Sequence, residues 1–285
     1  MGWVDYWCNA FTPDRVPLWD ASLAAQGVPL VLRSDPEDSF AEPEVMLARM
    51  RECGIDTLVL PTCDLPPHAD VTDYETFAAR LAESADLAAR FPGCFAAAWS
   101  IDPGHGMQGV RRAAEVLARD WVVALHLHTH SFDRRFDDAE LYPYYALASD
   151  AGVPVIMQAG TSGGLMPSAC GQPIGIDRPA LYFPEAVFVL SHTGWPWVEE
   201  ACAMALKFPN VYLGSATQPP KRWSESLMRF ARGGGRSKVL LGTGFPLAGH
   251  RHLLAQLDDL EISDELRKHW LDENPHRVFA KLPAA

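Results

Sequence analysis

Short apolar runs alternate with longer amphipathic segments along the whole chain, and this alternation constrains the fold more than any other feature. Runs of this length, bounded by polar or glycine-rich stretches, are typical of buried strands in a parallel sheet. Eight such strands with helices between them, in a chain of 285 residues, fit the size of one closed barrel. The expected strands cover residues 3–8, 56–60, 95–100, 122–128, 154–158, 187–191, 211–213 and 239–241.

We therefore predict an α/β protein with the (β/α)8 (TIM) barrel fold, organised as a single domain over residues 1–285. A doubly wound open sheet is the alternative, because GHGMQG at 104–109 matches the dinucleotide-binding pattern GxGxxG. That pattern also needs an acidic residue at the end of the next strand, where this chain has His128, Thr129 and His130. We therefore interpret the glycines as an ordinary strand-to-helix loop.

Composition and charge exclude several classes of partner. The chain is 48% hydrophobic and 21% charged, which is enough to bury a large core. Its formal net charge is -12 and no run of Lys or Arg forms a basic patch, so we expect no nucleic-acid binding. No stretch approaches the ~18 apolar residues that cross a membrane, so we expect no membrane partner. The six cysteines are scattered without a CxxC pair, which indicates reduced thiols and a cytoplasmic protein.

Two long loops follow the carboxyl ends of expected strands, where barrel enzymes carry their active sites. One covers residues 13–43 and the other covers residues 161–179. Loops of this length in a compact domain are often lids or binding segments. In GTSGG, the stretch at 160–164, no helix follows Ser162 as a nucleophile elbow requires, so a serine nucleophile is disfavoured. Cys170, in the second loop, is also a weak nucleophile candidate.

The fourth expected strand, VVALHLHTH, carries three histidines at a spacing of two. Successive side chains of a strand point to opposite faces. The apolar residues of this strand then share the face toward the helices, namely Val123, Leu125 and Leu127. His126 and His128 point into the barrel, and His130 lies just beyond them near the rim. Imidazoles at this spacing are compatible with metal binding and equally with hydrogen-bonded interior positions, so both interpretations stay open.

A further histidine ends the sixth expected strand, in FVLSHTGWPWVEEA. Its place between a strand and a helix puts His192 at the mouth of the barrel, as the strongest single catalytic candidate. Trp195 could line a pocket for a planar substrate or pack against a helix. Gln158 ends the fifth strand at the same rim, where a neutral amide would hydrogen-bond a substrate or a histidine. Asp5 and Asp102 could each orient a histidine, although we favour structural roles for both.

Several motifs together carry a family resemblance that spans nearly the whole chain. They are VDYWCN, WSIDP, GVPVIMQAG, FVLSHTGWPWVEEA, KFPNVYLGSA, KVLLGTGFP and DENPHRVF. With them, the chain resembles the amidohydrolase-related group of the amidohydrolase superfamily, the branch that contains metal-dependent decarboxylases and hydrolases such as aminocarboxymuconate-semialdehyde decarboxylase. The resemblance implies the (β/α)8 fold and an active site at the carboxyl ends of the strands.

The resemblance also implies a metal site, and this chain departs from it at most ligand positions. The family's first strand reads Asp-x-His-x-His, whereas Trp7 and Asn9 stand at the two histidine positions. Gln158 replaces the histidine of the fifth strand, and Gly244 replaces the aspartate after the eighth. Of this ligand set, His192 alone matches. We expect Gly244→Asp to place a carboxylate beside His192 and to weaken the binding of an anion.

These departures determine the expected chemistry. Zinc sites in proteins supply three or four donors, so we expect no metal cofactor; the alternative is one divalent metal such as zinc in a rebuilt histidine site. The expected catalytic residues, acting as general acid and base, are His126, His128 and His192. The expected substrate-binding residues are Trp7, Asn9, Trp99, His130, Gln158, Trp195 and Thr243.

The expected substrate is a small anionic molecule, carboxylated or aromatic, held in part by imidazolium charge. The expected activity is that of a hydrolase or lyase, with hydrolysis, decarboxylation or a related reaction by acid/base chemistry. The alternatives are a metal-dependent hydrolase or decarboxylase with a rebuilt histidine site, and a non-catalytic barrel that binds a small molecule. A homo-oligomer is compatible with each of these.

Overall fold

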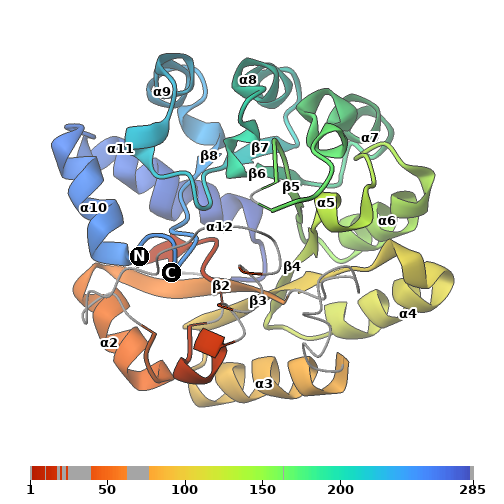
Figure 1. Ribbon diagram of the computed structural model, residues 1–285, viewed down its shortest axis with the longest axis horizontal. Helices are drawn as coiled ribbons and strands as arrows, with labels where there is room; N and C mark the ends of the chain where they lie inside the picture. The colour runs from red at the N-terminus through yellow and green to blue at the C-terminus, as the bar shows by residue number, and fades with distance from the viewer. Residues whose placement is uncertain are drawn as a thin grey trace.

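The computed structural model describes residues 2–9, 11–17, 20, 24, 40–62, 77–162 and 164–282. Within them, eight parallel strands form one sheet in the order β1 to β8, and the sheet curls into a barrel (Figure 1). The strands are β1 (Trp3–Asp5), β2 (Ile55–Thr62), β3 (Phe95–Ser100), β4 (Val122–Leu127), β5 (Val155–Gln158), β6 (Phe188–Ser191), β7 (Val211–Gly214) and β8 (Val239–Leu240). Each overlaps a strand expected from the sequence, so the predicted (β/α)8 barrel is confirmed.

Helices surround the sheet on its outer side (Figure 1). In the described part of the chain they are α2 (Pro43–Glu52), α3 (Phe77–Arg90), α4 (Gly106–Leu117), α5 (Thr129–Phe132), α6 (Tyr142–Asp150), α7 (Asp177–Tyr182), α8 (Val198–Lys207), α9 (Glu225–Arg232), α10 (His250–Asp259), α11 (Asp264–Lys268) and α12 (Asn274–Val278). Among the described residues, no helix has the length and apolarity that a membrane crossing requires.

The interior of the barrel is packed around the ring of Tyr6, which follows β1. The ring is fully buried, and its hydroxyl hydrogen-bonds Oγ of Ser191 at 2.9 Å across the barrel. Gly214 and Gly242 leave room for it, because a Cβ at either position would overlap the Tyr6 side chain. Phe279, beyond α12, stacks on the same ring with centroids 6.5 Å apart. The interior is therefore a packed core rather than a channel.

The barrel closes where β1 meets the chain around β8, and we call this region the closure seam. β1 has three residues and β8 has two. Beyond them, Cys8 and Phe245 form an isolated parallel bridge, and the Gly244 N–H donates to the carbonyl of Trp7 at 2.8 Å. The Asn9 N–H also donates to the Phe245 carbonyl, at 3.2 Å. The seam therefore depends on residues 5–9 and 243–245 rather than on a long strand ladder.

The predicted alternation of β4 is correct for most of the strand. Leu125 and Leu127 pack in the layer between the sheet and the helices, as expected. The assignment of Val123 to the same face is wrong, because Val123 belongs to the cluster inside the barrel. The pairing of β3 with β4 shifts register between Ala97 and Ala98, which leaves Val123 as the extra residue of β4. Beyond this irregularity, the alternation resumes and directs His126 inward.

The structure describes the GxGxxG match in full and the two long expected loops in part. Gly109, in the GxGxxG match, lies on α4 where a Cβ would overlap the hydroxyl of Tyr144 on α6, so close helix packing requires a glycine there. This agrees with the interpretation as an ordinary loop and helix start. The loop expected at 13–43 lies largely outside the described residues. The loop expected at 161–179 is described apart from residue 163 and contains two short 3-10 helices, Ala169–Gly171 and Pro173–Ile176.

Candidate functional site

Four aromatic rings meet at the carboxyl ends of the strands. Trp7 follows β1, His126 and His128 come from the end of β4, and His192 follows β6. The Trp7 ring meets the rings of His126 and His192 edge-on, with centroids 4.7 and 5.8 Å apart, and those of His126 and His128 are 6.3 Å apart. Together with Gln158, at the end of β5, these residues form what we call the mouth cluster. It unites the three histidines that the sequence analysis proposed as catalytic.

One ring nitrogen of His126 has a hydrogen-bond partner and the other has none. Its ring is completely buried, and Nδ1 hydrogen-bonds Oγ of Ser100, the last residue of β3, at 2.9 Å. Its Nε2 is buried and finds no partner among the described residues. A buried polar atom without a partner costs about 1–3 kcal/mol, so such atoms are uncommon in folded proteins. One nitrogen of His126 is therefore available to a ligand.

His128 has a tautomer that its neighbours determine. The backbone N–H of Ser131 donates to Nδ1 of His128 at 3.2 Å, and the Ser131 hydroxyl contacts the same nitrogen. Because a backbone N–H can only donate, Nδ1 carries no proton, and the neutral ring must carry its proton on Nε2. The side chain of Gln158 also hydrogen-bonds this ring. Ser131 and Gln158 together therefore fix both the orientation and the tautomer of His128.

His192 is positioned by an unusual backbone conformation. Its φ is 64° and that of Thr193 is 60°, so two consecutive residues without a glycine adopt the left-handed region. Such residues are uncommon and are retained mainly where the surrounding structure, often a functional site, demands them. Nδ1 of His192 is buried and has no partner within the described part of the protein. The cluster therefore contains a second imidazole nitrogen that is open to a ligand.

Burial lowers the pKa of all three imidazoles. Desolvation, followed by repulsion from His130 and His192, lowers the pKa of His128 to about 3. Desolvation, with a smaller contribution from His130, lowers the pKa of His192 to about 3 as well. The pKa of His126 falls well below its ordinary value, again mainly through desolvation. The cluster is therefore neutral at pH 7, which corrects the expectation that imidazolium charge attracts the substrate before it binds.

Trp99 does not join the mouth cluster, although the sequence analysis counted it as substrate-binding. It lies in the apolar layer between β3 and α4, on the opposite face of β3 from its neighbour Ser100. Ser100 points inward and contacts His126, so alternation along the strand turns Trp99 outward. Trp99 is therefore not placed at the mouth, and strict application of the alternation rule would have predicted this position.

His130 adjoins the cluster, since its ring centroid lies 6.1 Å from that of His128 and its buried Nε2 has no partner among the described residues, whereas Trp195 lies outside the cluster. Nδ1 of His130 donates to the carbonyl of Pro167 at 2.9 Å and lies 3.4 Å from Sγ of Cys170. Burial raises the pKa of the Cys170 thiol to about 11, which agrees with its weak standing as a nucleophile. Trp195 is 56% exposed, and its carbonyl accepts a hydrogen bond from the Thr161 N–H. Its ring is therefore available at the surface rather than packed against a helix.

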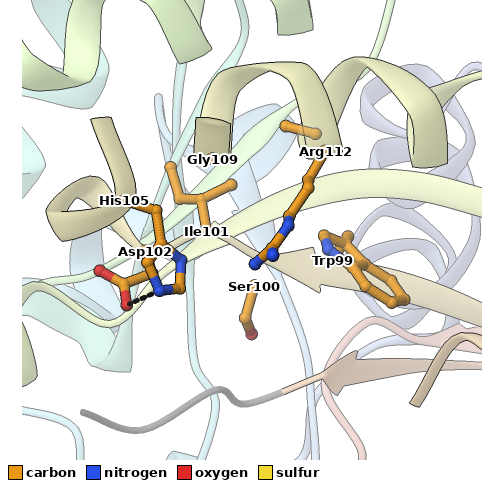
Figure 2. Close-up of a pocket in the computed structure, with 8 residues that line it drawn as sticks. Trp99, Ser100, Ile101, Asp102, His105, Gly109 and Arg112 are labelled. Atoms are coloured by element: carbon orange, nitrogen blue, oxygen red, sulfur yellow. Dashed lines mark ion pairs between the residues drawn. The ribbon is translucent and has the colours of Figure 1, made fainter. Parts of the chain in front are cut away.

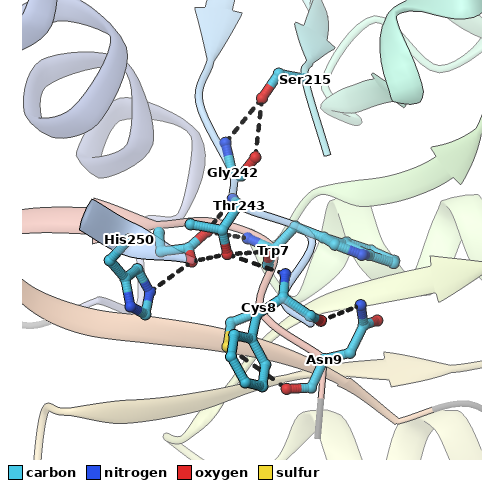
Figure 3. A network of polar contacts seen from close by, with 9 residues as sticks. Trp7, Cys8, Asn9, Ser215, Gly242, Thr243 and His250 are labelled. Carbon is cyan, nitrogen blue, oxygen red and sulfur yellow. Dashed lines mark hydrogen bonds and ion pairs between the residues drawn. The ribbon is translucent and has the colours of Figure 1, made fainter. Parts of the chain in front are cut away.

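Asn9 and Thr243, which were expected to bind substrate, are engaged in the closure seam (Figure 3). Nδ2 of Asn9 donates to the carbonyl of Phe245 at 2.6 Å. Oγ1 of Thr243 donates to Oδ2 of Asp5 at 2.6 Å, and Nε2 of His250 lies 3.0 Å from the same oxygen. Asp5 therefore does orient a histidine, as one interpretation held. Sequence reasoning missed that this histidine is His250, because 245 residues separate the two and no motif links them.

The metal site implied by the family resemblance does not fit the residues present. Trp7 stands at a ligand position with a side chain that has no lone pair for a metal ion. At Gly244 the φ is 63°, and a Cβ would overlap the backbone N of Thr217 and lie 2.7 Å from its Cα. An aspartate there would displace the backbone. The expectation that Gly244→Asp probes anion binding in an intact fold is therefore corrected.

The mouth histidines do not form a compact ligand group either. Only one group of three or more His, Cys, Asp or Glu residues in the described ranges places all its ligand atoms within 4.8 Å of one another. That group is Asp5, Cys8 and His250, at the closure seam. The rebuilt site of three mouth histidines would therefore need those rings to move closer together.

A shallow pocket lies on the helix side of β3, between this strand and α4 (Figure 2). Asp102, His105 and Arg112 supply its polar atoms. Nε2 of His105 lies 3.7 Å from Oδ2 of Asp102, and the Gly104 N–H donates to Oδ1 of the same carboxylate at 2.8 Å. Asp102 thus contacts a histidine, but it also has the structural role that we favoured, because it caps the 3-10 helix Pro103–His105 that precedes α4.

A closed parallel barrel with polar side chains at the carboxyl ends of its strands defines the class of TIM-barrel proteins whose sites lie at that face. A comparison with protein families assigns the chain to one family within this class. A family model described as amidohydrolase matches residues 67–281, and the chain therefore belongs to the amidohydrolase family. Among curated proteins, none matches this sequence.

Solved structures with the same fold cover nearly the whole chain. An uncharacterized TIM-barrel protein from Bordetella bronchiseptica is 22% identical, with a TM-score of 0.76 and 99% of both chains covered. The 5-carboxyvanillate decarboxylase from Novosphingobium aromaticivorans, with bound manganese and 3-methoxy-4-hydroxy-5-nitrobenzoic acid, is 15% identical, with a TM-score of 0.68 over 98% of this chain and 97% of that chain. A dihydroxybenzoic acid decarboxylase from Polaromonas, with bound manganese and 2-nitroresorcinol, is 15% identical, with a TM-score of 0.64 over 99% and 98%.

Proposed function

We propose that the protein is an enzyme that binds a small aromatic carboxylate at the mouth of the barrel and removes its carboxyl group by imidazole acid/base chemistry. The observation that carries this proposal is the pair of buried nitrogens, Nε2 of His126 and Nδ1 of His192, that lack partners among the described residues. A ligand would supply the missing hydrogen bonds. The aromatic acid and phenol held by two structurally similar decarboxylases support this ligand class.

The arrangement of the cluster supports an aromatic substrate in particular. Trp7 supplies an aromatic surface whose centroid lies within 5.8 Å of the rings of His126 and His192. A planar ring that packs on this surface would place its carboxylate beside the imidazoles. The negative charge then favours the imidazolium form, so binding raises the pKa of these histidines and takes up a proton from solvent.

The proton taken up on binding is the one that the reaction needs. A histidine delivers it to the ring carbon that bears the carboxylate, acting as a general acid. The bond between that carbon and the carboxylate then breaks, its electron pair restores the aromatic ring, and CO2 leaves. The histidine is neutral again, and each turnover has consumed one proton and released one CO2. His128, whose tautomer is fixed by Ser131 and whose ring is held by Gln158, would keep its place beside the substrate while His126 and His192 contact it.

Turnover in D2O tests this proposal. The full-length protein is incubated with a panel of hydroxybenzoates and carboxylated methoxyphenols, and CO2 release is measured together with deuterium at the vacated ring position. We expect one deuterium per CO2, and a loss of turnover of at least about 100-fold in His126→Ala, because a positioned general acid contributes about that much. Full activity in His126→Ala, or no turnover with any member of the panel, would contradict the proposal.

The second candidate is a metal-dependent decarboxylase or hydrolase in which His126, His128 and His192 hold one divalent ion. The manganese bound by two structurally similar decarboxylases favours it. Treatment with a chelator separates the two candidates. Activity that survives complete metal removal supports acid/base chemistry by the imidazoles alone, whereas activity that disappears and returns with manganese supports the metal-dependent candidate. A barrel that binds the aromatic acid without turnover would be revealed by affinity without CO2 release.

A further inference from the structure

A second cluster of metal-binding side chains lies at the closure seam, outside the mouth cluster. It contains the Asp5 carboxylate from β1, the Cys8 thiol just after β1 and the His250 imidazole at the start of α10. All three residues are buried, and their ligand atoms lie within 4.8 Å of one another. We propose that Asp5, Cys8 and His250 bind one divalent ion of the zinc class, which ties the first strand to the chain after the last.

Oδ2 is the oxygen of Asp5 that would take part in such a site, and it also accepts a hydrogen bond from the Thr243 hydroxyl at 2.6 Å. Oδ1 already accepts hydrogen bonds from the backbone N–H groups of Trp7 and Thr243, at 3.1 and 3.0 Å. Oδ2 faces Nε2 of His250 at 3.0 Å. The ligand atoms of a tetrahedral zinc site lie about 3.3–3.8 Å apart, given zinc–ligand distances of about 2.0–2.3 Å. The ion would therefore replace the proton between Oδ2 of Asp5 and Nε2 of His250. Oγ1 of Thr243 would continue to donate its hydrogen bond to the Asp5 carboxylate.

Charge supports the same assignment. A divalent ion deprotonates a thiol that coordinates it. The thiol proton goes to solvent, and one carboxylate and one thiolate then neutralise the two positive charges of the ion. The buried site becomes electrically neutral as a whole.

The donor set also selects the kind of ion. A thiolate with an imidazole suits zinc and cobalt, whereas manganese and magnesium prefer oxygen donors. A small pocket adjoins the site, and its lining includes His250, Gly249, Phe245 and Cys53. The site differs from the mouth cluster in position and in donors. It would stabilise the seam, where β1 and β8 are short, rather than take part in a reaction.

Cobalt binding to the chelator-treated full chain tests the proposal. We expect one equivalent of cobalt(II) to produce a near-ultraviolet thiolate-to-cobalt charge-transfer band, which the mouth histidines cannot produce. Cys8→Ser should abolish the band, whereas Cys53→Ser, at the neighbouring pocket, and His192→Ala, in the mouth cluster, should keep it. Saturating zinc should raise the Tm by about 5 °C in the wild type and in Cys53→Ser, but not in Cys8→Ser.

His250→Gln provides a second variant in case Cys8→Ser fails to fold. It should keep the thiol but weaken cobalt binding at least tenfold, because it removes one of three protein ligands. Absence of the charge-transfer band in the folded wild type, or an unchanged band in Cys8→Ser, would overturn the proposal. Neither result would bear on decarboxylation at the mouth, which depends on different residues.

Discussion

The closure seam and the mouth cluster share the short segment of residues 5–9, because Asp5 belongs to the seam and the Trp7 ring to the mouth, yet their polar atoms differ in how they are paired. At the seam, the carboxylate of Asp5 is buried and faces four donors, two backbone N–H groups, the Thr243 hydroxyl and the His250 ring. At the mouth, His126 and His192 each bury a nitrogen that has no partner in the described structure. The hydrogen bonds of the seam stabilise the fold. The unpaired nitrogens of the mouth lower the stability of the fold but remain available to a ligand.

Replacement of Asp5 should have the largest effect on stability. Asp5→Ala leaves the Thr243 N–H, the Thr243 hydroxyl and Nε2 of His250 without their acceptor in a buried seam. Each buried donor left without its acceptor costs about 1–3 kcal/mol, so we expect a loss of at least about 3 kcal/mol in the free energy of unfolding in urea, measured in chelator-treated protein. Asp102→Ala is the matched control, because this partly exposed carboxylate caps one N–H group and should cost about 1 kcal/mol. Equal losses of stability in the two variants would show that the hydrogen bonds of Asp5 at the seam contribute no more than an ordinary helix cap.

Gly244→Ala should have the next largest effect, because it adds a Cβ where the seam passes Thr217. The φ of Gly244 is 63°, and the new atom would overlap the Thr217 backbone. Strain of this kind costs about 1–3 kcal/mol or more in the free energy of unfolding. Gly234→Ala is the control, since a Cβ there meets no atom within 4 Å. If Gly244→Ala unfolds at the same denaturant concentration as Gly234→Ala, the seam is more adaptable than its geometry indicates.

Much of the fold was predictable from the sequence, because buried parallel strands are short, apolar and regularly spaced. All eight strands overlap their expected ranges. The predicted face of Val123, in β4, was wrong because the pairing of β3 with β4 shifts register there. Such a shift depends on both strands, so the sequence of one strand does not predict it. The direction of His126 followed from alternation alone.

The candidate site was predictable in part. Strand ends indicated that His126, His128 and His192 lie at one face of the barrel, and the structure brings them together around Trp7. The contact between Asp5 and His250 was not predictable, because it joins the two ends of the chain through the closure of the barrel. Sequence alone also does not reveal which histidine nitrogens remain unpaired, since that depends on every neighbour of a buried ring.

A smaller effect on the free energy of unfolding is expected from pH, and it should arise from the histidines of the mouth. The folded-state pKa of His128 and of His192 is about 3, whereas an unfolded histidine has a pKa near 6.5. Between these values the unfolded state binds more protons, so the free energy of unfolding rises with pH, by up to about 1.4 kcal/mol per pH unit for each histidine. Urea unfolding at several pH values from 4.5 to 7.5 measures this slope.

His192→Gln removes one of these groups and should reduce the slope below pH 6.5, so that the variant gains stability relative to the wild type as the pH falls. Parallel pH profiles for the wild type and His192→Gln would mean that this imidazole is not held neutral in the folded protein. The comparison of slopes cancels the contribution of the many carboxylates that both proteins share.

The central claim is that the unpaired imidazoles of the mouth serve ligand binding and contribute nothing to folding. His192→Ala tests it most directly, with the free energy of unfolding and the affinity for an aromatic hydroxycarboxylate measured on the same preparation at pH 6. We predict that stability is unchanged or higher, because an unsatisfied buried nitrogen is removed while the backbone at residue 192 is unaltered, and that affinity falls at least about tenfold. A variant that loses about 2 kcal/mol or more of stability, yet binds the carboxylate as tightly as the wild type, would contradict the account.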